Sequence, residues 1–134
     1  MPLSVALEAV TGARELFDWF GYWPDFHDAE IIRLRLEAGA PSSILIHTWE
    51  MTNEIDAKGF YELRKHVVVE FVIEAISTIN LQDPWDHSIL FDLSIDKSDS
   101  GFRLSFSSSY GLSGTIEAQG LSLRITPGKP SQEA

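Results

Sequence analysis

The sequence contains no cysteine, and this absence excludes several kinds of site. Without a thiol there is no disulfide framework, no thiolate metal cluster and no cysteine nucleophile, which suits a reducing compartment. The chain also lacks an apolar run long enough to span a membrane. Residues 1–10 show neither a basic start nor an apolar stretch that ends in a small-residue cleavage site. We therefore expect a cytoplasmic protein.

Basic residues are also scarce. The chain has 10 lysines and arginines against 20 aspartates and glutamates, which gives a formal net charge of -10. The acidic excess lies in both halves, because residues 1–67 hold 11 acids and 6 bases and residues 68–134 hold 9 acids and 4 bases. Such a surface repels nucleic-acid phosphates and anionic lipids and attracts basic proteins. We therefore expect no nucleic-acid or membrane partner.

Apolar residues are plentiful. They make up 44% of the chain and include 8 Phe, 4 Trp and 3 Tyr, far more than a disordered chain of this charge would carry. A chain of 134 residues has the usual size of one domain with one core. We predict a single α+β domain over residues 1–134, with one N-terminal amphipathic helix packed on a mostly antiparallel sheet of about six to eight strands.

The helix is predicted over about residues 3–20. Its apolar side chains recur at steps of three and four: Leu3, Leu7, Val10, Leu16, Phe17 and Phe20. Gly12 weakens the middle of this segment. The helix should end near Gly21, and Pro24 prevents any continuation.

The sheet is predicted over about residues 29–126, followed by a loose tail at 127–134. Alternating apolar and polar residues indicate strands over 30–37, 44–49 and 67–81, the last being one long bent strand or two. In the first of these, Ile32, Leu34 and Leu36 should face the core. The polar stretch of residues 53–65 is predicted to be a loop.

The firmest structural prediction is a hairpin around residues 97–101. Apolar residues at 89, 91, 93 and 95 should face the core from one strand, and Phe102, Leu104 and Phe106 should face it from the other. A slip of one residue would bury Arg103, which fixes the register. A last pair of short strands is expected around Gly120.

The densest polar cluster is His27, Asp28 and Glu30. Imidazole and carboxylate are suitable metal ligands, and strand alternation would put Asp28 and Glu30 on one side with Ala29 on the other. Further ligands would have to come from elsewhere in the chain: His47, Glu50, His66 and His87. The alternative is structural, with Asp28 capping a backbone turn and His27 packed between aromatic rings. We favour the structural interpretation and expect no metal or cofactor.

No enzyme is expected. A serine nucleophile needs a neighbouring base, a third group that orients the base and a sharp turn, and the sequence indicates no such turn. The serines at 107–109 and 113 fit the solvent face of a strand. Gly111, Gly114 and Gly120 lie between strands, so they do not form a phosphate-binding loop.

A binding surface is the other kind of site that the composition favours. The acids expected on exposed strand faces are Glu70, Glu74, Asp92 and Glu117, and the large rings beside polar segments are Trp49 and Trp85. Complementary charge speeds encounter with a basic partner, and a tryptophan can anchor an interface. A competing hypothesis is a self-associating module in which residues 67–73 pair with a copy of themselves at a sheet edge.

Two motifs resemble the immunity protein 50 family. The first is Phe-Gly-Tyr-Trp-Pro-Asp-Phe-His-Asp-Ala-Glu-Ile at residues 20–31, and the second is Tyr-Gly-Leu-Ser-Gly-Thr-Ile-Glu-Ala at residues 110–118. The order of helix, aromatic motif, strands and glycine-rich segment is similar over roughly residues 10–128. The residues that carry the resemblance are Trp23, Pro24, Phe26, His27, Asp28, Glu30, Tyr110 and Gly111.

The resemblance implies an antitoxin. Members of that family are predicted to be encoded beside bacterial polymorphic toxins and to neutralise the toxin domain by binding it, without turnover. The hypothesis is then an immunity-like protein that blocks a basic toxin through an acidic, partly aromatic face of its sheet. A metal- or small-ligand-binding domain around His27, Asp28 and Glu30 is the alternative.

Overall fold

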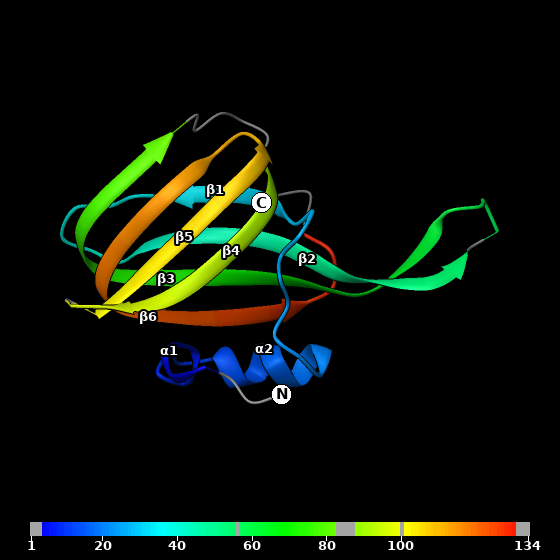
Figure 1. The fold of residues 1–134 in the computed structure, drawn as a ribbon, viewed down its shortest axis with the longest axis horizontal. Helices are drawn as coiled ribbons and strands as arrows, with labels where there is room; N and C mark the ends of the chain where they lie inside the picture. Colours follow the sequence, from blue (N-terminus) through cyan, green and yellow to red (C-terminus); the bar gives the residue numbers. More distant parts are fainter. Residues whose placement is uncertain (1–3, 56, 83–87, 100, 131–134) are drawn as a thin grey trace.

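The computed structural model describes residues 4–55, 57–82, 88–99 and 101–130. Two short helices precede six strands in the chain (Figure 1). The helices are α1 (Val5–Glu8) and α2 (Ala13–Phe20). The strands are β1 (Glu30–Arg35), β2 (Ser42–Ile55), β3 (Tyr61–Gln82), β4 (Ser88–Ser98), β5 (Gly101–Tyr110) and β6 (Ser113–Pro127).

The strands form a closed antiparallel barrel in the order β1-β2-β3-β6-β5-β4. The seam between β1 and β4 is short, with Glu30 opposite Ile89 and Ile31 opposite Ser88. Both helices lie below the barrel in Figure 1, α1 against β4 and α2 against β6, and their apolar side chains join the single hydrophobic core of the barrel. The prediction of an N-terminal helical segment on a mostly antiparallel sheet is therefore confirmed at this level.

The predicted single helix is wrong in one respect, because the helix is broken at Gly12. This residue has φ 92° and precedes α2. The backbone here approaches β6 so closely that the amide of Leu123 donates a hydrogen bond of 2.8 Å to the carbonyl of Thr11. A continuous helix would hold that carbonyl in its own hydrogen bonds, so the break attaches the helical segment to the barrel.

Bulges shift two of the predicted alternations. The register of β1 slips between Ile31 and Arg33, so Ile31 and Leu34 both pack against the core. Leu36 lies beyond the end of β1 and is 48% exposed. In β4 the register slips on both sides of Leu90, which becomes fully buried. The residue after it, Phe91, is 56% exposed instead of facing the core. A bulge adds one residue to a strand and so reverses which side chains face inward.

The hairpin of β4 and β5 is confirmed. Lys97 lies opposite Phe102 and Ser98 opposite Gly101, and the side chain of Arg103 faces outward. The expected last pair of strands is one continuous strand, β6, which passes through Gly120 without a turn. Residues 83–87, which connect β3 to β4, lie outside the described residues.

The second half of β2 and the first six residues of β3 extend beyond the barrel as a two-stranded hairpin, which we call the arm (residues 49–66 without 56; right in Figure 1). The predicted loop at residues 53–65 is therefore wrong, because Met51 pairs with Leu63 and Ile55 with Tyr61. Residues 67–73 pair with β2 on one side and β6 on the other. They are not an edge, which contradicts the competing hypothesis that these residues pair with a copy of themselves.

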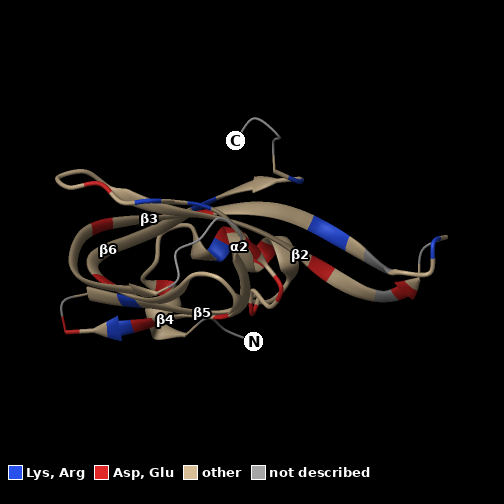
Figure 2. Ribbon diagram, turned by 90° about the horizontal axis from the view of Figure 1, so that it is seen from above, with Lys and Arg blue, Asp and Glu red and all other residues tan. Residues whose placement is uncertain are grey.

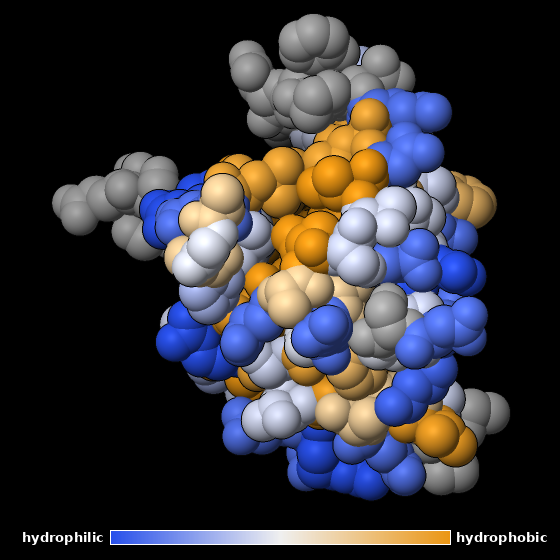
Figure 3. Space-filling view, turned by 90° about the vertical axis from the view of Figure 1, so that its left-hand side faces the viewer, coloured by the Kyte–Doolittle hydropathy of each residue, from blue (hydrophilic) through white to orange (hydrophobic). Residues whose placement is uncertain are grey.

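The opposite end of the barrel carries an apolar strip set in a hollow between polar margins (Figure 3). A cavity of about 490 Å³ opens there between residues 37–42, which join β1 to β2, and residues 73–76 of β3. From Glu74 onward β3 pairs only with β6 among the described residues, because β2 begins at Ser42 opposite Ile73. The end of β3 therefore extends past the start of β2 here.

Candidate functional site

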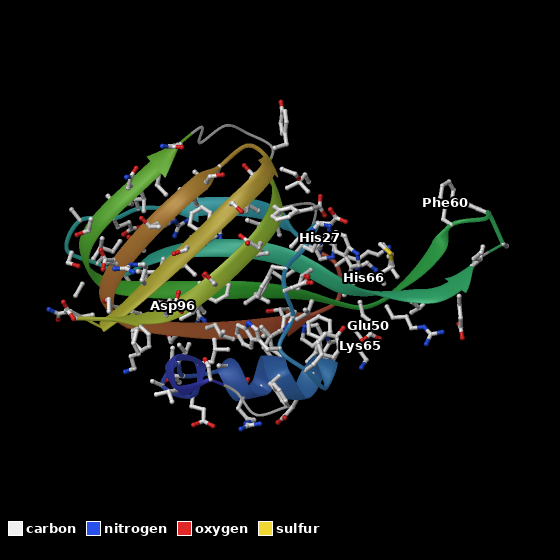
Figure 4. All side chains as sticks on the ribbon, in the orientation of Figure 1. His27, Glu50, Phe60, Lys65, His66 and Asp96 are labelled. Carbon is white, nitrogen blue, oxygen red and sulfur yellow. The ribbon has the colours of Figure 1, made fainter. Side chains whose placement is uncertain are left out.

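A groove of about 330 Å³ lies where the arm leaves the barrel. One wall is the segment that follows α2 (residues 22–28), and the other is residues 48–51 of β2. Figure 4 shows His27, Glu50, Lys65 and His66 gathered at this end of the barrel, with Phe60 far out on the arm. Most of the first motif of the sequence, from Tyr22 to Asp28, therefore lines one groove.

The segment after α2 is held in an unusual backbone conformation. Phe26 and Asp28 both have positive φ, at 62° and 67°, which is uncommon for residues other than glycine. Phe26 is 1% exposed, and its ring packs against those of Trp23 and Phe71 at centroid distances of 6.0 and 5.9 Å. The amide of Asp28 donates a hydrogen bond of 2.9 Å to the carbonyl of Leu90. Burial and backbone pairing therefore offset the strain.

Short polar contacts set the direction of the side chains in this segment. The Asp25 carboxylate accepts a hydrogen bond of 2.9 Å from the His27 amide. Nδ1 of His27 lies 3.1 Å from the Phe91 carbonyl, so this nitrogen carries the proton. Nε2 of His27 lies 3.7 Å from the Asp28 carboxylate, and both side chains are about half exposed. His27 contacts one aromatic ring, that of Phe91, and is otherwise open to solvent.

Tyr22 closes the groove toward the arm. Its hydroxyl donates a hydrogen bond of 2.8 Å to the Glu50 carboxylate. Partial burial, and then the hydrogen bond and charge of Glu50, raise the pKa of Tyr22 to about 12. The raised pKa means that folding favours the protonated phenol, so its contribution to stability is lost as the pH rises from about 10 through 12.

This contact can be tested by titrating tyrosinate absorbance in alkaline solution. In the native protein we expect one tyrosine to ionise at a pH well above the ordinary tyrosine value. This high-pH step should be absent in Tyr22→Phe. In Glu50→Gln its pKa should fall toward the ordinary value of 10, because the carboxylate charge is gone. An unchanged titration in Glu50→Gln would contradict the contact.

The groove combines acidic groups with aromatic rings. Asp25, Asp28 and Glu50 supply carboxylates, and no lysine or arginine is among the described residues that line the groove. The rings are those of Tyr22, Trp23 and Trp49. Acidic residues also lie beside α2, while the arm carries both acidic and basic residues (Figure 2). Such a surface attracts cationic groups, which aromatic faces also favour.

The structure divides the predicted cluster of His27, Asp28 and Glu30. Ala29, between them, is fully buried, and Glu30 turns to Nδ1 of His47 at 2.9 Å. His47 in turn contacts His66, at 3.0 Å between Nε2 and Nδ1. Within the described residues, no three histidine, aspartate or glutamate side chains converge as metal ligands do. His87 lies outside those residues.

The four acids predicted for a binding face lie at separate places around the barrel. Glu70 forms an ion pair with Arg124 between β3 and β6, and Glu117 pairs with Arg103 at 3.2 Å between β6 and β5. Asp92 accepts a hydrogen bond of 2.7 Å from Ser107, and Glu74 is exposed opposite Gly120.

Two of these carboxylates are thus partly neutralised. Of the two predicted tryptophans, Trp49 lines the groove, and Trp85 lies outside the described residues. The second motif of the sequence lies where β5 turns into β6, with Tyr110 65% exposed and Gly111 at φ 95°. It does not line the groove.

The arm is the feature that sequence reasoning missed. It carries exposed apolar side chains on a ribbon outside the core: Met51 (57%), Ile55 (64%), Phe60 (69%) and Leu63 (39%). The signal was present as apolar residues spaced through a stretch rich in charges. The stretch lacks strict alternation of apolar and polar residues, so its pattern does not predict a strand. In the structure the strand pairing is irregular there, between Met51 and Ile55.

No known protein family, curated protein or solved structure matches this chain. Among the described residues there is also no helix with the length and apolarity needed to span a membrane. The groove and the arm are therefore the features that bear on function.

Proposed function

We propose that this chain is an immunity-like protein that binds a cognate bacterial toxin domain one to one and neutralises it without turnover. The observation that carries the proposal is the arm, which holds four large apolar side chains in water beside the acidic, aromatic groove. The resemblance of residues 20–31 to immunity protein 50 is compatible with it, since residues 22–28 line that groove.

The arm has the properties of an unfinished interface. A two-stranded ribbon is marginally stable on its own, and in this one the apolar residues Met51 and Leu63 lie opposite each other. Exposed apolar groups next to polar ones are typical of protein-binding sites. A partner that covers the ribbon would bury these side chains.

Charge determines the kind of partner. The net charge of -10 and the carboxylates of Asp25, Asp28 and Glu50 favour a basic toxin surface. Glu74 and Asp92 are exposed elsewhere on the barrel, where they add to the long-range field. The expected contact is a basic side chain in the groove with apolar groups along the arm.

Capture of the products of neighbouring genes, followed by titration calorimetry, tests the proposal directly. We expect a one-to-one complex and loss of the toxic activity in proportion to occupancy. Absence of any protein partner, together with a thermal shift caused by a metal or small ligand, would favour the ligand-binding alternative instead.

The double variant Met51→Ser/Ile55→Ser should weaken toxin binding by about 30- to 700-fold, because each of the two side chains loses about 1–2 kcal/mol of interface burial. Both side chains are more than half exposed in the free protein, so its melting temperature should change little. Val5→Ser is the matched control, since Val5 is 78% exposed on α1 and outside the arm. Equal affinity in the double variant and the control would place the interface elsewhere.

A further inference from the structure

Three titratable side chains from neighbouring strands form one hydrogen-bond chain at the root of the arm. Oε1 of Glu30 in β1 lies 2.9 Å from Nδ1 of His47 in β2, and Nε2 of His47 lies 3.0 Å from Nδ1 of His66 in β3. The two imidazoles are stacked, with centroids 5.2 Å apart and planes at 20°. His47 is only 6% exposed, so both of its nitrogens depend on these partners.

Hydrogen-bond chemistry fixes where the protons sit. An ionised carboxylate only accepts, so Nδ1 of His47 carries a proton and donates it to Glu30. In the neutral ring Nε2 of His47 is then an acceptor, so Nδ1 of His66 donates. Nε2 of His66 is left with a lone pair. The hydrogen-bonded set of Glu30, His47 and His66 therefore takes up its first additional proton there.

A first proton keeps all of the hydrogen bonds, and a second proton does not. With one proton added at Nε2 of His66, the hydrogen between the rings is still shared by one donor and one acceptor. With both rings charged, Nε2 of His47 and Nδ1 of His66 each carry a hydrogen, and they face each other at 3.0 Å. The hydrogen bond between the rings is then impossible, and two positively charged rings lie with their centroids 5.2 Å apart.

The charged groups that surround the pair act on the second proton in opposite directions, because a carboxylate favours it and a cation opposes it. Glu30, on β1, is the carboxylate in contact with it, and Lys129, beyond β6, is a cation that acts on His66. Lys65, the neighbour of His66, directs its Nζ away to the carbonyl of Phe20. Burial first, then His47 and Lys129, lower the pKa of His66 from 6.5.

The chain of hydrogen bonds holds the base of the arm and one wall of the groove. Trp49 lines the groove and packs on both imidazoles, at centroid distances of 4.9 Å from His47 and 6.0 Å from His66. The carbonyl of His66 accepts a hydrogen bond of 2.7 Å from the amide of Gly128, just after β6. Separation of the two rings would therefore loosen Trp49 and the junction of β3 with the end of β6.

We propose that Glu30, His47 and His66 form a pH-sensitive latch, in which a second proton on the histidine pair breaks the bond between the rings and releases Trp49 and the arm. The latch is a property of this chain by itself and does not depend on the proposed toxin partner.

The direction of the pH effect follows from proton counting. At low pH the open form holds two additional protons on the histidine pair, whereas the closed form holds only one. The latch is then stable above the ordinary histidine value of about 6.5 and weakens as the pH falls below it. For a difference of one proton, the opening constant should rise about tenfold for each pH unit.

Histidine NMR and amide hydrogen exchange of the arm, measured from pH 7.5 to 4.5 and corrected for intrinsic exchange rates, test the latch. We expect two separate titration steps for the pair and arm exchange that rises as the second step proceeds. In His66→Gln the amide can donate or accept toward His47 at any pH, so arm exchange should become nearly independent of pH. His27→Gln is the control, because His27 is half exposed and contacts neither ring.

Two results would overturn the latch. One is arm exchange that rises with acid equally in His66→Gln and in the native protein. The other is independent one-step titration of His47 and His66 with arm protection unchanged down to pH 4.5. If His66→Gln also shows lower global stability, arm exchange relative to that of the β4–β5 hairpin in the same sample still isolates the local opening.

Discussion

Replacing Gly12 by alanine should lower the free energy of unfolding by about 3–5 kcal/mol, the largest effect that we expect from adding a single carbon atom. A Cβ at this position would lie 2.0 Å from the backbone carbonyl oxygen of Leu123. No rotamer change can relieve a contact with backbone, so α2 or β6 must move. The φ of 92° adds a further cost of about 1 kcal/mol for any residue other than glycine.

The expected observation is a melting temperature about 10–15 °C lower, followed by circular dichroism. Gly21→Ala is the matched control, because Gly21 has a similar φ of 85° but nothing lies within 4 Å of its missing Cβ. That variant should lose only about 1 kcal/mol. Equal losses in the two variants would mean that backbone strain, and not the close approach of Gly12 to β6, is what the glycine relieves.

Much of the fold could be predicted from local patterns. The helical stripe, the register of the β4–β5 hairpin and the alternation of β2 are all encoded by nearest neighbours in the sequence. In the hairpin, burial of Arg103 would have been so costly that only one register was possible. Each of these features needs only a segment and its turn to be specified.

The features that could not be predicted depend on contacts between distant residues. The barrel closes through two residue pairs between β1 and β4, and both strands carry bulges near that seam. A bulge inverts the alternation, so the sequence pattern around Leu90 pointed to the wrong face. The break at Gly12 likewise has its cause in Leu123, more than a hundred residues away.

The candidate site shows the same division. Nearness in sequence grouped His27 with Glu30, but the buried Ala29 between them separates their side chains. The pair that does form, His47 with His66, comes from neighbouring strands. Its partners become visible only when the pairing of β2 with β3 is known, because the bulge beside Lys65 brings His66 against His47. The groove was accessible to sequence reasoning only through the motif that forms one wall.

The second large effect is expected at Phe26, and it bears on whether that motif is structural or functional. Phe26→Ala should cost about 3–5 kcal/mol, because a ring that is 1% exposed between Trp23 and Phe71 would leave a cavity. Phe26→Leu keeps most of the apolar volume and should cost about 1–2 kcal/mol. Urea unfolding of the two variants measures the difference. Similar small losses in both would mean that the ring packs less tightly than the structure shows.

Asp28 separates the two roles because its side chain is half exposed and its φ is 67°. Asp28→Gly relieves the strained conformation but also frees the unfolded chain, so its stability should stay within about 1 kcal/mol of the native value. A variant that folds normally but loses affinity for a toxin domain would assign this carboxylate to the groove's binding surface. Retained affinity would mean that the motif acts through Phe26, by placing the groove wall beside β2, and that its acids serve the general charge of the surface.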